Sequence, residues 1–198
     1  MKLYVGLDRQ DAEDALRTGQ LGTVVSTEGR GVYATPDIDL ADYFASVPRR
    51  VKGVVLEVDA DPGHVLSVPP VRPSEAREIG GRLYLLNKDY RRLRNPTVQR
   101  TEWDEINAEA VTQVNGHIPL AGEMIDEDLM RETAELLTEI AESRGYDSFE
   151  FPRNGGDFSW FVIFDPARVH PIRILSDEEV EALLPPEEYC KFPHTFSR

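Results

Sequence analysis

The stretch Lys2-Leu-Tyr-Val-Gly-Leu7 opens the chain with apolar side chains at every second position. This period of two predicts a short, half-buried β-strand. A helix is predicted directly after it, because Asp8 or Asp11 can cap its N-terminus and Gly19 can end it. The side chains expected on the buried face of that helix are Ala12, Ala15 and Leu16. The chain therefore begins with a strand and a helix.

The same order occurs again after a glycine-containing segment, residues 22–31, that is predicted to be a loop. Gly31-Val-Tyr-Ala-Thr35 is predicted to be a second strand that ends at Pro36, and Asp37 or Asp39 can cap the helix that follows. The expected buried stripe of this helix is Leu40, Ala41, Phe44 and Ala45. A third strand is predicted over residues 51–58, where the pattern again alternates.

The middle of the chain gives weaker signals. Four prolines interrupt regular structure between residues 59 and 73, at positions 62, 69, 70 and 73. Between residues 74 and 120, the only elements predicted are a short apolar piece at 83–86 and a helix over 103–114. We interpret residues 65–120 as an insertion, and within it Arg82–Arg100 is a basic stretch, either a solvated surface or a contact for a phosphate-bearing or acidic ligand.

The C-terminal part again reads clearly. A helix capped at Asp126 and ended by Gly145 carries apolar residues at helical spacing. Strands are predicted over 148–151, 160–164 and 170–175, and Ser176 opens a capping box before a short last helix. Residues 186–198 are expected to form a tail. Because helices and half-exposed strands mix without a repeat or a linker, we predict one α+β domain over residues 1–198, with two packed sheets.

Composition limits the classes of function. The 198 residues carry a formal net charge of −14, which disfavours non-specific binding to nucleic acid or to anionic membranes. No run of residues reaches the roughly 20 apolar positions of a membrane-spanning helix, and the N-terminus lacks the features of a signal peptide. With its single cysteine, Cys190, the chain is expected to be cytoplasmic.

Common catalytic motifs are absent from the sequence. There is no phosphate-binding loop, no GxGxxG, no GxSxG and no HExxH. The four histidines do not have the spacing of metal ligands, and one cysteine cannot build a thiolate zinc site. We therefore predict no metal site.

A set of short motifs, taken in order, carries the information that remains. These are Tyr4-Val-Gly6, Gly31-Val-Tyr33, the helix with Ala41 and Tyr43, and Trp160-Phe-Val-Ile-Phe-Asp-Pro166. The order resembles the ADP-ribosyltransferase fold of diphtheria toxin and the poly(ADP-ribose) polymerases, a split β-sandwich with flanking helices. The resemblance covers both ends of the chain and leaves residues 65–120 without a counterpart.

The resemblance implies that NAD is bound as a substrate. Tyr4 and Gly6 would belong to the strand that receives the nicotinamide, with the Gly6 backbone hydrogen-bonding the nicotinamide amide. Tyr33 would stack on the nicotinamide ring, and Tyr43 would line the other side of the pocket. The ordinary alternatives are a strand tyrosine, a helix tyrosine that covers the core and a glycine near a turn.

Two positions depart from the family pattern. Val5 stands where the family has His or Arg, and Trp160 stands where it has the catalytic Glu. Val5 has no polar atom to replace the His or Arg, and the Trp160 indole cannot accept the hydrogen bond that a carboxylate would. Ser159 would be a poor substitute for the Glu after a one-residue shift. The nearest carboxylates are Glu150 and Asp157, which we take as candidate catalytic residues, although Asp157 also suits a turn.

The resemblance leaves three readings of function. The first is an enzyme that transfers ADP-ribose from NAD to a macromolecular acceptor and releases nicotinamide. The second is a catalytically degenerate module that binds NAD, or an acidic protein that binds a basic partner, as the net charge of −14 permits. The third is a domain that uses this fold for something unrelated.

Overall fold

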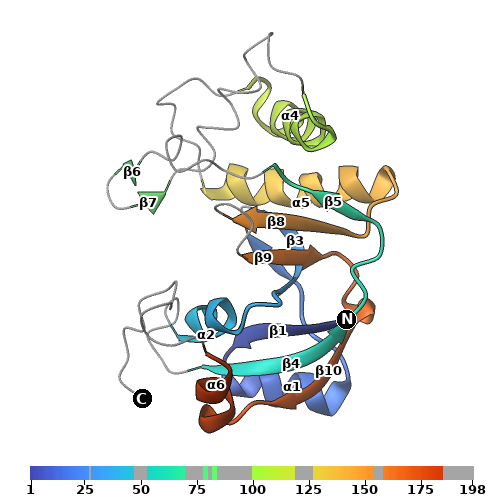
Figure 1. Cartoon of the computed structure of the whole chain (residues 1–198). Coiled ribbons are helices and arrows are strands. Elements are labelled where there is room, and N and C mark those ends of the chain that lie inside the picture. Colours follow the sequence, from blue (N-terminus) through green and yellow to red (C-terminus); the bar gives the residue numbers. More distant parts are fainter. Residues whose placement is uncertain are drawn as a thin grey trace.

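The computed structural model describes residues 1–26, 28–46, 53–69, 78–79, 82–83, 100–118, 127–153 and 158–184. The predicted α+β class is confirmed, with helices and mostly antiparallel sheets arranged in layers (Figure 1). Asp157, the tail 186–198 and most of the basic stretch Arg82–Arg100 lie outside the described residues.

The first sheet has three strands in the order β1–β4–β10, all antiparallel. Their bounds are Lys2–Leu7, Val54–Ala60 and Val169–Ile174. One face of this sheet packs on helix α1 (Arg9–Thr18) and on the second sheet, in an aliphatic core centred on the fully buried Leu3, Leu56 and Val58. The other face is covered by α2 (Ile38–Ser46) and α6 (Asp177–Leu183).

The second sheet has five strands in the order β2–β3–β9–β8–β5. Their bounds are Val24–Ser26, Gly29–Ala34, Phe158–Ile163, Ser148–Arg153 and Val65–Ser67. All neighbours are antiparallel except the parallel pair β5–β8. Its inner face meets the first sheet. Its outer face is covered by α5 (Glu127–Ser143), beyond which α4 (Glu102–Asn115) packs (Figure 1).

The remaining elements are small. A two-stranded ribbon joins β6 (Glu78–Ile79) to β7 (Arg82–Leu83), and a 3₁₀ turn, η3 (Pro166–Arg168), precedes β10. Within residues 65–120, β5 joins the second sheet and α4 contributes Trp103 and Ile106 to the core beneath α5. These parts of the segment are therefore built into the core.

The caps of the helices agree with the sequence signals. Asp8 accepts a hydrogen bond from the backbone N–H of Asp11 at 2.9 Å, and Gly19 ends α1 with a φ of 74°. Ser176 and Glu179 form the predicted capping box of α6. These contacts involve residues three or four positions apart, so the local sequence is sufficient to specify them.

Four local predictions are wrong. Leu16 and Phe44 were expected to be buried, but they are 37% and 45% exposed. The segment 22–31 was expected to be a loop, yet it contains β2 and the start of β3, and the proline-rich segment contains β5. Strands of three residues have too few positions to show a period, and their pairing partners lie far away in the sequence.

Candidate functional site

The two sheets meet at a single backbone bridge between β1 and the end of β3. The Tyr4 N–H donates to the Thr35 carbonyl at 2.8 Å, and the Thr35 N–H donates to the Tyr4 carbonyl at 2.9 Å. Both polar groups of a strand residue point to the same edge, and this direction alternates along the strand. The N–H and C=O of Gly6 therefore point to the same outer edge of β1 as those of Tyr4, away from β4.

The corresponding edge of β3 carries Tyr33. Thr35 directs its N–H and C=O toward β1, and alternation directs those of Tyr33 to the same side of β3. On that side, β2 pairs with β3 only as far as Gly31, so Tyr33 lies past the end of β2. The Arg30 N–H has the opposite direction and donates to Thr138 Oγ1 at 2.8 Å. If the antiparallel register of the Tyr4–Thr35 bridge continued by two residues, Gly6 would lie opposite Tyr33, but β1 and β3 form only this one bridge. We call the backbone positions of Gly6 and Tyr33, which point toward the space between the two strands, the facing edges.

The side of Gly6 that a side chain would occupy is filled by α2. A Cβ atom there would overlap the Ala41 carbonyl oxygen and lie 2.6 Å from the Ala45 nitrogen. The helix thus rests directly on the strand, and glycine is required for this packing. The face of β1 at Gly6 is therefore occupied by α2.

The two other tyrosines of the predicted site lie on or beneath α2. Tyr4 is buried between the first sheet and α2, with Lys2 Nζ 5.4 Å from the centre of its ring. Tyr43 is half-buried and meets Phe44 edge-on at 5.5 Å. It is two residues from both Ala41 and Ala45, or about 200° around the helix. Tyr43 therefore projects from the side of α2 that faces away from Gly6.

The ring of Tyr33 lies on the outer face of the second sheet. Its hydroxyl donates to the Gly29 carbonyl at 2.8 Å, and it packs against the aromatic core beneath α5. Burial, together with the negative charge of Glu28, raises the pKa of Tyr33. The phenol is therefore protonated at neutral pH and serves as a hydrogen-bond donor.

Glu28 makes a long-range contact that the sequence did not reveal. It lies in the turn between β2 and β3, and its Oε2 accepts a hydrogen bond from Trp160 Nε1 at 3.1 Å. Trp160 in turn stacks flat on Phe151, with ring centroids 5.3 Å apart and an interplanar angle of 8°. The contact joins residues 132 positions apart, so no local pattern could indicate it.

The candidate carboxylate Glu150 lies on the other face of the second sheet. It is half-buried on β8, and its cross-strand neighbours are Phe161 and Ser67. Because Phe161 belongs to the aliphatic core between the sheets, Glu150 is directed toward the inner face. Tyr33 and Glu150 thus project to opposite faces. Val5 is buried in the same inner core.

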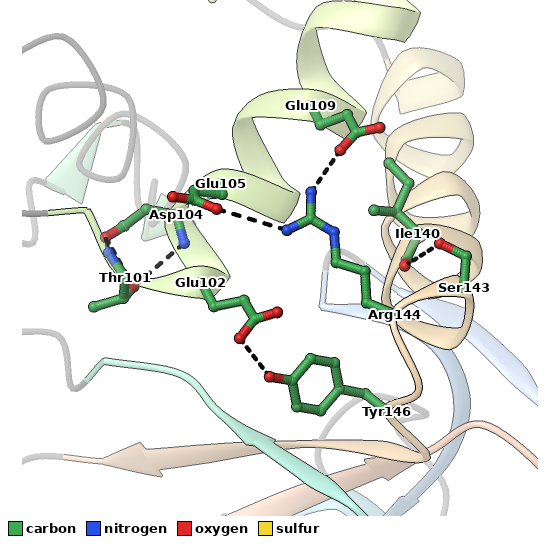
Figure 2. Close-up of polar contacts among 9 residues, drawn as sticks. All are labelled: Thr101, Glu102, Asp104, Glu105, Glu109, Ile140, Ser143, Arg144 and Tyr146. Carbon is green, nitrogen blue, oxygen red and sulfur yellow. Dashed lines mark hydrogen bonds and ion pairs between the residues drawn. The ribbon is translucent and has the colours of Figure 1, made fainter.

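A polar network holds α4 against α5 (Figure 2). Arg144 pairs with Glu109 at 2.7 Å and with Glu105 at 3.7 Å, and the Tyr146 hydroxyl donates to Glu102 at 2.5 Å. The bond to Glu102 raises the pKa of Tyr146. Part of the acidic character of α4 is therefore balanced by contacts to the end of α5.

The described residues contain no cluster of three or more His, Cys, Asp or Glu side chains that could hold a metal ion. Within the same residues, no helix combines the length and apolar character needed to cross a membrane.

Comparisons with known proteins give little information about family. No protein-family model matches the chain, and no curated protein matches it. A solved structure titled "Crystal structure of an anti-CRISPR protein" is similar over 87% of this chain and 95% of that chain, with 15% sequence identity and a TM-score of 0.37. A similarity at this level supports no argument about fold or function.

Proposed function

We propose that the chain is an ADP-ribosyltransferase-like domain that binds NAD as a substrate and transfers ADP-ribose to a macromolecular acceptor. The observation that supports this most is the pair of facing edges. Gly6 directs its backbone N–H and C=O to the outer edge of β1, where β1 parts from β3 after the Tyr4–Thr35 bridge. These are the backbone groups that the sequence resemblance assigns to the nicotinamide.

A primary carboxamide is chemically complementary to such an edge. Its carbonyl oxygen accepts one hydrogen bond and its NH₂ group donates others, so it can bond to the N–H and the C=O of one strand residue together. In the proposed complex, the nicotinamide carboxamide binds Gly6 in this way. Tyr33 has its backbone on the opposite edge and its ring on the outer face of the second sheet, and in the proposal this ring supplies the aromatic contact to the nicotinamide.

The proposed reaction breaks the bond between the ribose C1′ and the nicotinamide nitrogen. The electron pair of that bond leaves with nicotinamide, positive charge develops on the ribose, and an acceptor nucleophile that loses its proton forms the new bond to C1′. The developing charge requires a nearby carboxylate. Glu150 and Asp157 remain our candidates, with Glu150 favoured because a strand holds its side chains in fixed positions.

Calorimetric titration with NAD, followed by an assay of nicotinamide release, tests the proposal. Binding with turnover supports the enzyme, and binding without turnover supports a degenerate NAD-binding module. The absence of binding would remove both readings. It would leave the acidic protein that binds a basic partner, which the net charge of −14 favours.

Charge-removing variants test the carboxylates. Glu150→Gln keeps the shape of the side chain and is expected to slow nicotinamide release by about 10²-fold or more with unchanged NAD affinity. Asp157→Asn tests the second candidate in the same way. Glu139→Gln, on the exposed side of α5, is the matched control and should behave as the wild type. Normal turnover in both site variants would exclude both residues.

A further inference from the structure

Strand β2 lies at one edge of the five-stranded sheet and carries an exposed apolar side chain. Among the described residues, β3 is the one strand that pairs with β2, so the other edge of β2 is unpaired. Val24 lies opposite Gly31, which has no side chain to cover it, and Val24 is 56% exposed. A Cβ atom at Gly22, two residues earlier, would meet no atom within 4 Å. The surface beside the start of β2 is therefore open.

The backbone polar groups of Val25 point to this unpaired edge. Val25 is the partner of Arg30 in β3, but the Arg30 N–H donates to Thr138 Oγ1 at 2.8 Å and not to β2. Val25 and Arg30 therefore form a non-hydrogen-bonded pair of the antiparallel ladder, in which the N–H and C=O of Val25 are directed away from β3. An extended segment that lies along this edge can bond to both groups.

The outer edge of β10 shows the protection that β2 lacks. β10 contains Pro171, which has no backbone N–H, and its pairing with β4 is interrupted between Pro171 and Arg173. Proline, irregular pairing and charged side chains are common ways in which edge strands avoid pairing with another chain. The segment Gly22-Thr-Val-Val-Ser26 contains neither a proline nor a charged residue. It is rich in β-branched residues, which suit an extended strand.

We propose that β2 is a docking edge for an extended, basic segment of another protein, which adds to the five-stranded sheet as a further strand. Main-chain hydrogen bonds to Val25 provide the affinity, and contact with the exposed Val24 selects an apolar or β-branched residue in the partner. The docking edge goes beyond the proposed function, because neither the edge nor the added strand requires NAD.

Charge favours a basic partner over a second copy of this chain. Helix α5 packs beside β2 and carries the exposed Glu132, Glu135 and Glu139, whereas Arg131 is its one basic residue. A basic segment is attracted by this helix and by the net charge of −14 of the whole chain. Two copies joined at β2 would instead bring two equal negative charges together, which disfavours a dimer.

Nuclear magnetic resonance titration of the full chain with two designed peptides tests this edge without NAD. The probe is an acetylated, amidated peptide of alternating valine and threonine with a lysine at each end, and its control has a glutamate at each end. We expect the lysine peptide to shift the backbone amide signals of Val24–Ser26 and to slow hydrogen exchange of the Val25 N–H. The glutamate peptide should bind about tenfold more weakly, and the difference should shrink as salt is added.

Variants of the edge test whether the peptide binds there. Val25→Pro removes the outward N–H and should weaken binding of the lysine peptide about two- to tenfold, the effect of one hydrogen bond. Val24→Lys adds a positive charge to the edge and should weaken binding about tenfold. Ile172→Lys is the matched control, because it makes the same change at a side chain of β10 that is 48% exposed, and it should bind as the wild type. If Val25→Pro does not fold, Val24→Lys decides.

Three results of the peptide titrations would overturn the proposal. These are shifts that leave Val24–Ser26 unaffected, equal binding of the lysine and glutamate peptides, and unchanged affinity in Val24→Lys. Protection of the Val25 N–H that rises with protein concentration in the absence of peptide would also overturn it, since a second copy would then occupy the edge. Nicotinamide release is a separate measurement, so this proposal and the proposed function can each fail alone.

Discussion

The two faces of the five-stranded sheet are built from different side chains. The inner face and the three-stranded sheet that it meets bury valine, leucine, isoleucine and alanine, with Phe161 as the one aromatic residue of that core. The outer face, beneath α4 and α5, buries Phe149, Phe151, Phe164 and Trp103, with Tyr33 and Trp160 at its margin. The described side chains of the aliphatic core are hydrocarbon only, with Glu150 half-buried on the same inner face. The aromatic core ends in a phenol and an indole, and both make hydrogen bonds.

Because the two cores differ in polar groups, we expect substitutions in the aliphatic core to affect stability and substitutions at the margin of the aromatic core to affect binding as well. A substitution within the aliphatic core changes only packing, because the hydrocarbon side chains of this core make no hydrogen bonds or ion pairs. Substitutions at the margin of the aromatic core change hydrogen bonds and charge as well as packing. Of the facing edges, Tyr33 belongs to the aromatic core, whereas Gly6 lies against α2, on the other face of the three-stranded sheet.

The largest effect is expected at the centre of the aromatic core. Phe149 is fully buried and contacts the rings of Trp103, Phe151 and Phe164 edge-on. Phe149→Ala should lower the free energy of unfolding by about 3–5 kcal/mol. Leu56→Ala in the aliphatic core should cost about 2–5 kcal/mol. Denaturant titrations measure both, and a smaller loss for Phe149→Ala than for Leu56→Ala would contradict the greater weight given to the aromatic core.

The next effect concerns the contact of β1 with α2. Gly6→Ala should lower the free energy of unfolding by about 1–3 kcal/mol, because the new Cβ overlaps the backbone of α2 at Ala41 and Ala45. Gly22→Ala is the matched control, since a Cβ at Gly22 meets no atom within 4 Å. If thermal and denaturant unfolding of Gly6→Ala match the wild type, helix packing does not explain this glycine.

A third effect tests the margin of the aromatic core as a binding region. Tyr33→Ala should weaken NAD binding by about 1–3 kcal/mol, the range for loss of one stacking ring. Tyr33→Phe keeps the ring and removes only the hydrogen bond to the Gly29 carbonyl, so its NAD affinity should stay close to the wild-type value. Calorimetry decides, provided that circular dichroism shows both variants to be folded. Equal affinity in Tyr33→Ala and the wild type would remove Tyr33 from the proposed site.

The smallest effect lies on the outer side of the three-stranded sheet, where charge replaces packing. The Ser176 N–H and then Arg173 hold the pKa of Glu179 below its ordinary value of 4.5. A lowered folded-state pKa stabilises the fold above pH 4.5, and this contribution is lost as the pH falls through the folded-state pKa. Glu179→Gln should therefore flatten the dependence of stability on pH below 4.5, measured by denaturant titration at several pH values. A profile identical to that of the wild type would show that the capping contact does not contribute.

Much of the fold follows from the sequence, because the signals that define it are local. Asp8, Gly19 and Ser176 act on residues within three or four positions. The alternation in residues 2–7 and 51–58 predicts two strands, but not that both of their faces are covered, since Tyr4 and Val55 are buried as well. Short strands such as β2 and β5 were missed, since three residues do not establish a period. Leu16 and Phe44 were placed wrongly because a helical stripe tells which residues share a face but not how far the neighbouring sheet extends over it.

The candidate site depends on contacts that only the tertiary structure decides. Glycine at position 6 could be read from the sequence, but its purpose could not, because the backbone of α2 approaches it only after the sheet has formed. The hydrogen bond from Trp160 to Glu28 joins a strand near the C-terminus to a turn near the N-terminus. Local sequence determines the elements, since their hydrogen bonds and apolar periods are short in range. The pairing of distant strands determines which edges face each other and which charge lies beside which ring.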